Sequence, residues 1–412
     1  MASAKTIPRV VDPVRPPAMA TAPVAHRNVA APSAVREGKI AAADAIRALA
    51  IFSVVAYHVA QMAQPAWHGQ PHVFFEIGVW GVDCFFVLSG FLLGGEYIRR
   101  LVEPAITLQP VRLFWKKRIL RIVPLYFACV IVSAIFDGTL AHALPSVGDV
   151  VAHLLFLHDF SATMSTSING PFWTMPIDME FYLLLPLYGA VMAALFRAVP
   201  KLPREPILFA SLALITILGF VYRYCELRYN PAALHSFADE VVWVRNVIGM
   251  SGAFSLGAAL SLVSLRRMRP TPLASVLLLA VAAACEAIVE HISSLEGGPV
   301  TTHLLLGQTL FDFVGALSAT LVMYVVIEGD FSFLRRFVRS RAISEIALLA
   351  YGVYLLHFPI ANFVAPFFAH FGSVERFAGI GLATIIPTFV LAFIGNRLVE
   401  KPFLTIKARL RA

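Results

Sequence analysis

Residues 41–63 read AAADAIRALAIFSVVAYHVAQMA, and this stretch decides the fold class. An α-helix needs about 20 mostly apolar residues to cross the hydrocarbon core of a bilayer, so the stretch is long enough to span one. Apolar segments of similar length recur down to the C-terminus. The sequence therefore predicts an all-α integral membrane protein, a polytopic bundle of about ten transmembrane helices. The other nine are expected near residues 77–98, 115–136, 172–196, 206–224, 241–264, 273–291, 304–327, 344–368 and 377–398.

The composition excludes an ordinary soluble protein. Hydrophobic residues make up 58% of the 412 residues and charged residues 14%, whereas soluble domains carry about 25% charged residues. The formal charge of +8 does not indicate a nucleic-acid partner, because the Lys and Arg residues lie beside the apolar segments, as topology determinants do. The four cysteines fall in or at the edge of apolar segments without metal-ligand spacing, so we expect packing residues and no metal site.

The connecting loops predict the orientation. Lys and Arg concentrate in alternate loops, which marks those loops as cytoplasmic. Two outer loops, 225–240 and 369–376, weaken the alternation because arginines lie in them or beside them. The balance still predicts an even number of spans, both termini in the cytoplasm, and a multi-pass protein of the plasma (inner) membrane. The outer loops without any Lys or Arg are 64–76, 137–171 and 292–303.

The chain is expected to form one membrane domain, residues 41–403, between two tails. Residues 1–40 are rich in Ala and Pro, contain no apolar run near the start, and are predicted to be a disordered cytoplasmic tail. Residues 404–412 are predicted to be a short basic cytoplasmic tail. The apolar piece Val147–Leu157 is too short to span, so we expect a re-entrant or interfacial helix there.

Ionisable residues inside the predicted spans are candidate functional groups, because burying them in a bilayer is costly. The first helix carries Asp44, Arg47 and His58. Arg47 and His58 are eleven residues apart, close to three helical turns, so they share a face about 16 Å apart along the axis. Asp44 lies three residues before Arg47 and can pair with it. The structural alternatives are a core histidine bonded to a neighbouring helix and a snorkelling arginine.

The other candidates divide by depth. Arg118 and Arg121 share a face at the cytoplasmic end of the third helix and suit a buried phosphate. Asp83, Glu180 and His357 lie at or beyond the midplane, at depths resembling that of His58. This polarity suits a phosphate-bearing donor from the cytoplasm and a neutral acceptor from outside. Asp178 is expected to be solvated, and Asp312 stays unassigned, with a helix–helix hydrogen bond as its default role.

Two other interpretations stay open at this point. A proton-coupled transporter or flippase of a glycan precursor would also place acids and histidines near the midplane. In a scaffold subunit, the polar groups would only join helices.

Six motifs in order resemble the acyltransferase-3 family of membrane O-acyltransferases, in its stand-alone type without a C-terminal esterase-like domain. The resemblance covers residues 41–403. One segment departs from the family pattern, with Thr174 in place of the usual Ser and an unusual Pro176. The motifs are Asp44–Ala50 followed by Tyr57-His58 (Arg, ten residues, His), Gly81–Phe91, Arg118–Tyr126, Trp173–Tyr182, Tyr354–His357 and Glu400–Phe403.

The resemblance implies transfer of an acyl group, with acetyl as the default, from cytoplasmic acyl-CoA (acetyl-CoA) to a hydroxyl of an extracytoplasmic glycan or lipid-linked saccharide. A small-molecule glycoside is the alternative acceptor. Acyl-CoA would act as co-substrate, with no bound cofactor.

A histidine suits the base that deprotonates the acceptor. The expected catalytic residues are His58 as base, with Glu180 or Asp83 orienting it. The expected donor-binding residues are Arg118 and Arg121 on the phosphates and Arg47 beside the thioester path. The supporting residues are Asp44, Ser89 (a nucleophile if the route is covalent), Trp173, Tyr182 and His357.

Overall fold

The computed structural model describes residues 32–63, 77–103, 105–141, 144–266, 268–293, 301–329 and 337–409. Within these ranges every regular element is a helix, which confirms the all-α prediction. Nine of the described helical segments are long and apolar enough to cross a membrane, and one shorter apolar helix accompanies them. The chain is therefore a multi-pass membrane protein.

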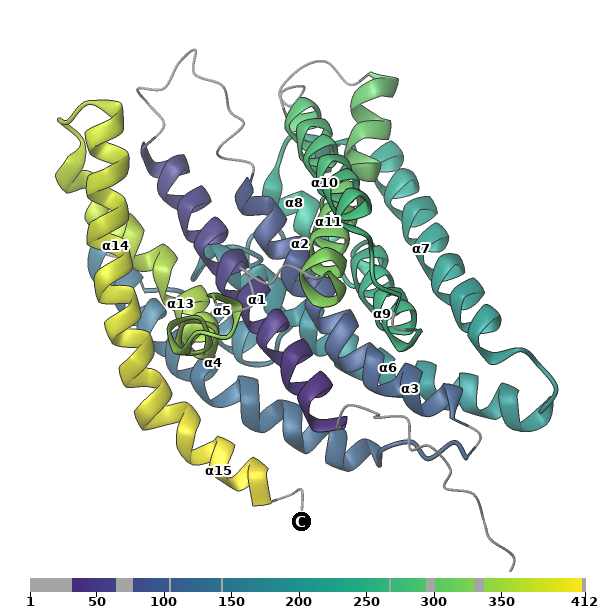
Figure 1. Ribbon diagram of the computed structural model, residues 1–412. Helices are drawn as coiled ribbons and strands as arrows, with labels where there is room; N and C mark the ends of the chain where they lie inside the picture. Colours follow the sequence, from purple (N-terminus) through teal and green to yellow (C-terminus); the bar gives the residue numbers. More distant parts are fainter. Residues whose placement is uncertain are drawn as a thin grey trace, which may run out of the picture.

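The long helices and their connections follow the predicted order (Figure 1). The first two spans are α1 (Pro32–Ala63) and a continuous rod made of α2 (Ile77–Ser89), the π-helical segment η3 (Gly90–Gly94) and α3 (Gly95–Val102). The next elements are α4 (Val111–Ala141), α5 (Val147–Leu154), η4 (His158–Phe160), η5 (Gly170–Trp173), α6 (Thr174–Ala198), α7 (Arg204–Tyr229), η6 (Pro231–Leu234), α8 (Phe237–Trp243) and α9 (Ser251–Leu265). The last are α10 (Pro272–Ser293), α11 (Thr302–Glu328), α13 (Arg341–Val364), η7 (Ala365–Phe368), α14 (Ser373–Gly395), η8 (Asn396–Glu400) and α15 (Lys401–Arg409).

The predicted span 241–264 is broken. The short helix α8 ends at Trp243, and α9 begins only at Ser251. The 15 residues of α9 cover about 22 Å, which is less than the hydrocarbon thickness. Hydropathy alone cannot detect this break, because the residues on both sides of it are apolar.

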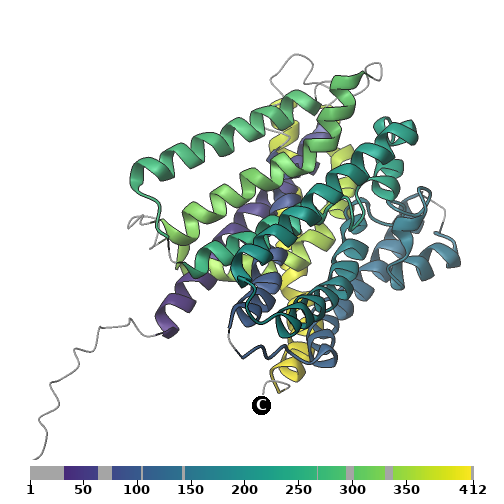
Figure 2. The ribbon, with the colours of Figure 1, turned by 90° about the vertical axis from the view of Figure 1, so that its right-hand side faces the viewer.

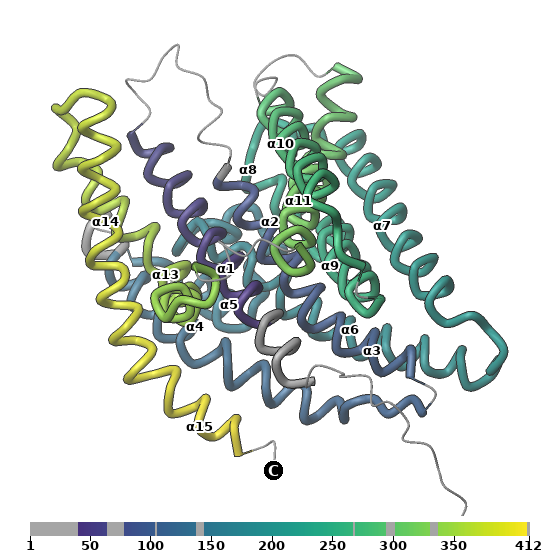
Figure 3. The backbone as a smooth tube through the Cα atoms, viewed as in Figure 1, coloured from purple at the N-terminus to yellow at the C-terminus, as the bar shows by residue number. Residues whose placement is uncertain are grey.

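Helix α1 occupies the middle of the bundle (Figures 1 and 2). It packs against α2, α13, α14 and α11. One buried hydrophobic cluster joins α1 to α2, α9 and α11, and a second joins it to α4, α13 and α14. The tube in Figure 3 shows α14 continuing into α15 along one side of the molecule. Residues of α1 therefore face side chains from both halves of the chain.

A close helix contact holds α9 against the second span. A Cβ on Gly90 would lie 2.1 Å from the backbone oxygen of Phe254, and one on Gly257 would lie 2.0 Å from that of Val87. Only glycine allows the two backbones to come this near. Gly90 and Gly257 thus allow close packing of the two helices.

The arginines that flank the loop 225–240 are buried in ion pairs. Arg223 Nη2 lies 2.7 Å from Asp312 Oδ2, and Arg245 Nε lies 2.8 Å from Glu240 Oε1. Arg245 Nη2 is also 3.4 Å from Asp312 Oδ1. Carboxylates neutralise these arginines, so the arginines do not act as topology signals. This explains why they break the alternation of Lys and Arg between the loops. Asp312 thereby gains a structural role.

The two described ends of the chain, the start of α1 and the end of α15, lie at the same end of the bundle (Figures 1 and 2). This arrangement agrees with an even number of crossings, and the side of the membrane they face stays a prediction. Helix α1 begins at Pro32 and α15 continues to Arg409, so both extend into segments predicted as tails. Residues 32–40, predicted to be disordered, are therefore helical, and residues 1–31 of the predicted tail lie outside the described residues.

Candidate functional site

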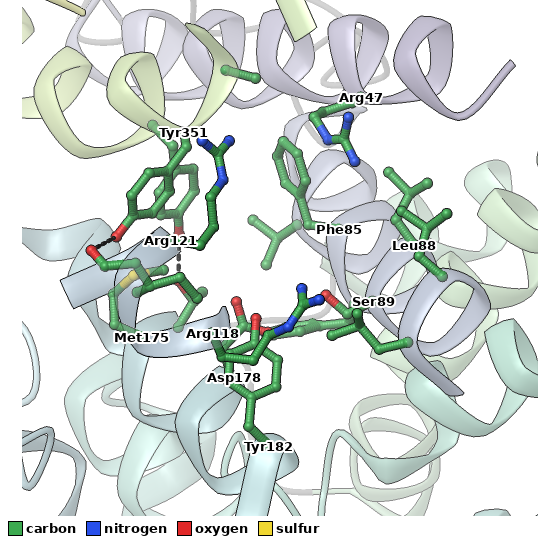
Figure 4. Close-up of a pocket in the computed structure, with 18 residues that line it drawn as sticks. Arg47, Phe85, Leu88, Ser89, Arg118, Arg121, Met175, Asp178, Tyr182 and Tyr351 are labelled. Atoms are coloured by element: carbon green, nitrogen blue, oxygen red, sulfur yellow. Dashed lines mark hydrogen bonds between the residues drawn. The ribbon is translucent and has the colours of Figure 1, made fainter. Parts of the chain in front are cut away.

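An inner cavity of about 260 Å³ lies between α1, α2, α4, α6 and α13 (Figure 4). Arg47, Arg118 and Arg121, the three predicted donor-binding residues, all line it. Ser89 and Tyr182, predicted as supporting residues, line it as well. The rest of the wall is largely apolar, so the arginines supply its positive charge.

The three arginines differ in their partners. Arg47 Nη1 lies 2.7 Å from Asp44 Oδ1, which confirms the predicted pair. Arg121 Nη1 lies 2.5 Å from Oε2 of Glu400, a buried carboxylate at the start of the Glu400–Phe403 motif. Among the described side chains, Arg118 forms no ion pair within 4 Å, and its Nε is buried without a hydrogen-bond partner. Arg118 therefore has the largest unused capacity to bind an anion.

Asp178 is a cavity residue that the sequence analysis missed. It was expected to be solvated, yet it lines the inner cavity with an Oδ1 atom that has no hydrogen-bond partner. Figure 4 shows it beside Arg118. The available signal was its spacing of four residues from both Thr174 and Tyr182, which places all three on one face of α6.

An outer cavity of about 400 Å³ lies farther along α1, α2 and α13. His58 and Tyr57 of α1 line it, together with Trp173 at the end of η5. Inside it, His58 packs edge-on against Tyr57 and Phe358, with ring centroids 5.2 and 5.1 Å away. Trp173, a predicted supporting residue, thus shares a cavity with His58.

His58 forms a hydrogen-bonded pair with His357. His357 Nδ1 lies 2.8 Å from the carbonyl oxygen of Tyr354 and 3.1 Å from that of Val353, so Nδ1 carries the proton. His357 Nε2 is then an acceptor, and His58 Nδ1 lies 3.0 Å from it. His58 Nδ1 is also 3.0 Å from the carbonyl oxygen of Val54, which again requires a proton there. These contacts assign the tautomers and leave His58 Nε2 free to accept a proton.

The structure places Asp83 and Glu180 in other surroundings. Asp83 is 1% exposed and lies against Gly315 of α11, near the charges of Asp312 and Arg245. Glu180 accepts a hydrogen bond from the backbone of Val247, in the break between α8 and α9. Neither carboxylate lines the two cavities or contacts a ring nitrogen of His58 within hydrogen-bond distance. The residue held against His58 is instead His357.

A cluster of buried polar residues on α5 and η4 packs against Phe172 of η5. The His153 and His158 rings stack with centroids 3.9 Å apart, and His158 Nε2 lies 3.0 Å from the carbonyl oxygen of Phe172. Burial, with the nearby His153 as a smaller cause, lowers the pKa of His158 to about 3. Burial, reinforced by the charge of Glu180, raises the pKa of Asp159 to about 7.

Asp159→Asn should stabilise the protein at high pH only. The raised pKa means that folded Asp159 holds its proton more tightly than the unfolded chain, so its contribution to stability falls as the pH rises from about 4 to 7. The amide removes this dependence. We expect a higher melting temperature than wild type at pH 8 and an equal one near pH 4, measured in detergent micelles. An equal rise in melting temperature at pH 4 and at pH 8 would contradict the raised pKa of Asp159.

Comparisons with known proteins identify the family to which this membrane bundle belongs. The sequence matches the family described as "Acyltransferase domain" over residues 40–396, and the chain belongs to this family. It is 24% identical over 375 residues to "Peptidoglycan O-acetyltransferase OatA" of Listeria monocytogenes, covering 87% of this chain and 55% of that protein. It is 22% identical over 398 residues to "O-acetyltransferase OatA" of Staphylococcus aureus, covering 87% and 56%. The chain spans about half the length of the curated relatives it matches. No solved structure matches it.

Proposed function

We propose that the chain is an O-acetyltransferase of the plasma (inner) membrane that moves an acetyl group from cytoplasmic acetyl-CoA to a hydroxyl of an extracytoplasmic glycan. The observation that carries this proposal is the arrangement of two cavities one after the other along α1, α2 and α13. The inner cavity presents Arg47, Arg118 and Arg121, whereas the outer cavity presents His58. An anionic thioester donor and a neutral hydroxyl acceptor need these two environments on opposite sides of one reaction centre.

His58 acts as general base in this proposal, and His357 is a positioning residue. The acceptor hydroxyl gives its proton to His58 Nε2 while its oxygen attacks the thioester carbon. The C–O bond forms, the C–S bond breaks, and coenzyme A leaves as the thiolate toward the inner cavity. His357 accepts from His58 Nδ1 and so keeps the lone pair on Nε2. It takes the orienting role that the sequence analysis gave to Asp83 or Glu180.

The position of Ser89 supports direct transfer over a covalent acyl-enzyme. Ser89 lines the inner cavity, whose described walls contain no histidine; His58 lines the outer cavity instead, and the buried His357 contacts His58. A serine nucleophile needs an adjacent base to activate its hydroxyl. Asp178 is the carboxylate in that cavity, and it stands beside Arg118 (Figure 4).

A third cavity supports a saccharide acceptor. It measures about 420 Å³ and shares Tyr57, Val79, Phe237 and Arg245 with the outer cavity. Aromatic side chains alternate in its walls with groups that can bond hydroxyls, among them His235 and Gln308. Sugars offer apolar ring faces and hydroxyl edges to such walls. The curated relatives include a peptidoglycan O-acetyltransferase, which agrees with a glycan acceptor.

Mass spectrometry of surface glycans tests the proposal. Cells lacking the chain are compared with the same cells carrying the wild-type chain or His58→Ala. We expect an acetyl mass that returns with the wild type alone, and its position identifies the acceptor. Identical acetylation in all three would exclude a surface-glycan acceptor and favour a small-molecule glycoside. Substrate movement without covalent change would favour transport.

Arg118→Ala should weaken donor binding and leave the chemical step intact. A charge-assisted hydrogen bond contributes about 1.5–3 kcal/mol, so the KM for acetyl-CoA should rise about tenfold to a hundredfold with little change in kcat. Lys116→Ala, an exposed cation two residues earlier on α4, is the control and should leave KM unchanged. Equal KM values for Arg118→Ala and wild type would remove Arg118 from the donor site.

A further inference from the structure

Val82 and Tyr354 form the boundary between the inner and the outer cavity. They are the two residues that line both cavities in the described part of the chain. The helices cross this boundary in a consistent order. On α2, Val79 faces the outer cavity and Ser89 the inner one, with Val82 between them. An acyl group that moves from the arginines to His58 therefore passes the level of these two side chains.

The two sides of this boundary differ in how firmly they are held. The Tyr354 hydroxyl lies 2.8 Å from the carbonyl oxygen of Pro171 and 2.9 Å from Thr174 Oγ1. Its ring also packs edge-on against Phe85, with centroids 6.1 Å apart. Hydrogen bonds and ring packing thus fix Tyr354 in place. Val82 is a short, partly buried, apolar side chain. Its volume therefore sets the width of the passage between the two cavities beside Tyr354.

We propose that Val82, which shares the boundary between the cavities with the fixed ring of Tyr354, determines which acyl groups this protein transfers. The inference rests on the proposed acyl transfer. When the acceptor oxygen attacks, the thioester carbon must lie near His58 while the sulfur still belongs to the donor in the inner cavity. The acyl chain on that carbon then meets the boundary in the transition state, where contacts determine kcat/KM. A short acyl group such as acetyl fits, and each further methylene meets Val82.

Membrane vesicles carrying the chain and its native glycan provide the test. They are supplied with radiolabelled acetyl-CoA, propionyl-CoA or butyryl-CoA, and label in the glycan is counted. One methylene in a shaped apolar pocket changes selectivity by about 10–200-fold. Val82→Ala should therefore raise the ratio of butyryl to acetyl transfer at least about tenfold. Val82→Ile adds a methylene and should lower the ratio of propionyl to acetyl transfer.

Val79→Ala is the matched control. It makes the same chemical change one turn earlier on α2, at a residue that lines the outer and third cavities but not the inner one. Its acyl ratios should equal those of wild type, whatever happens to its total rate. Unchanged ratios in both Val82 variants, or an equal shift in Val79→Ala, would overturn the assignment. Wild-type vesicles that transfer no acetyl from acetyl-CoA would overturn the proposed function itself.

Discussion

Replacing His58 by alanine is expected to slow acetyl transfer by about 10²–10⁴-fold, the range that general bases contribute. His58 Nδ1 is committed to His357 and to the carbonyl oxygen of Val54, so Nε2 is the nitrogen that can take the acceptor proton. The inner-cavity arginines remain in place, so the KM for acetyl-CoA should change little. The measurement is label transfer in vesicles over a range of acetyl-CoA concentrations, with membrane content checked by immunoblot.

His58→Gln separates the chemistry of His58 from its packing. A glutamine amide can donate to His357 Nε2 as His58 Nδ1 does, but it cannot take up a proton at neutral pH. It should be as inactive as His58→Ala while the protein stays in the membrane. Activity of His58→Gln within tenfold of wild type would show that His58 is a core histidine, the structural alternative raised by its sequence position.

If His357 positions His58, replacing His357 should reduce kcat by an intermediate amount. Without the acceptor at His357 Nε2, the His58 ring keeps a bond to Val54 alone and turns more freely. His357→Ala should therefore lower kcat less than His58→Ala does and leave the donor KM unchanged. A loss of bound donor with an unchanged kcat would contradict a positioning role.

The long spans could be predicted because a helix in a bilayer satisfies its own backbone and shows an uninterrupted apolar run. The span 241–264 could not, because its break depends on tertiary contacts. Arg245 leaves the helical register to reach Asp312 on α11, and Gly249 allows backbone contact, since a Cβ there would lie 1.8 Å from the Val244 oxygen. Neither partner can be identified from local hydropathy.

The order of polar residues along a helix could be predicted from sequence, but their neighbours could not. Counting residues along α1 placed Arg47 and His58 on one face, and the structure puts them at the inner and the outer cavity. Asp83 and Glu180 were predicted at the depth of His58 too. Asp83 lies against α11 and Glu180 against the break between α8 and α9, and these directions depend on how the helices pack. His357 belonged to the same depth group, and the fold of α13 against α1 selects it as the partner of His58.

Asp312→Ala should destabilise the protein by about 3–5 kcal/mol, the cost of leaving a buried charge without its partner. Arg223 is 2% exposed, and its Nη2 lies 2.7 Å from Asp312 Oδ2. Arg223 also donates to the carbonyl oxygens of Thr309 and Gln308, so it cannot turn toward water when Asp312 is lost. Unfolding by SDS in mixed micelles measures the effect as a transition at a lower SDS fraction.

The double variant Arg223→Met with Asp312→Leu distinguishes a stranded charge from lost packing. Replacing both charges by apolar side chains of similar volume is often neutral, so the double variant should be more stable than Asp312→Ala. Arg266→Ala supplies the comparison for an exposed pair. Arg266 Nη2 lies 2.7 Å from Glu205 Oε2, but the two side chains are 50% and 33% exposed, so its loss should cost about 0–1 kcal/mol. If Asp312→Ala unfolds at the same SDS fraction as Arg266→Ala, the Arg223–Asp312 pair does not hold the broken span 241–264 in place. If it unfolds earlier and the double variant recovers, the arginines beside the loop 225–240 are structural charges, because their stability effect then depends on the buried carboxylate.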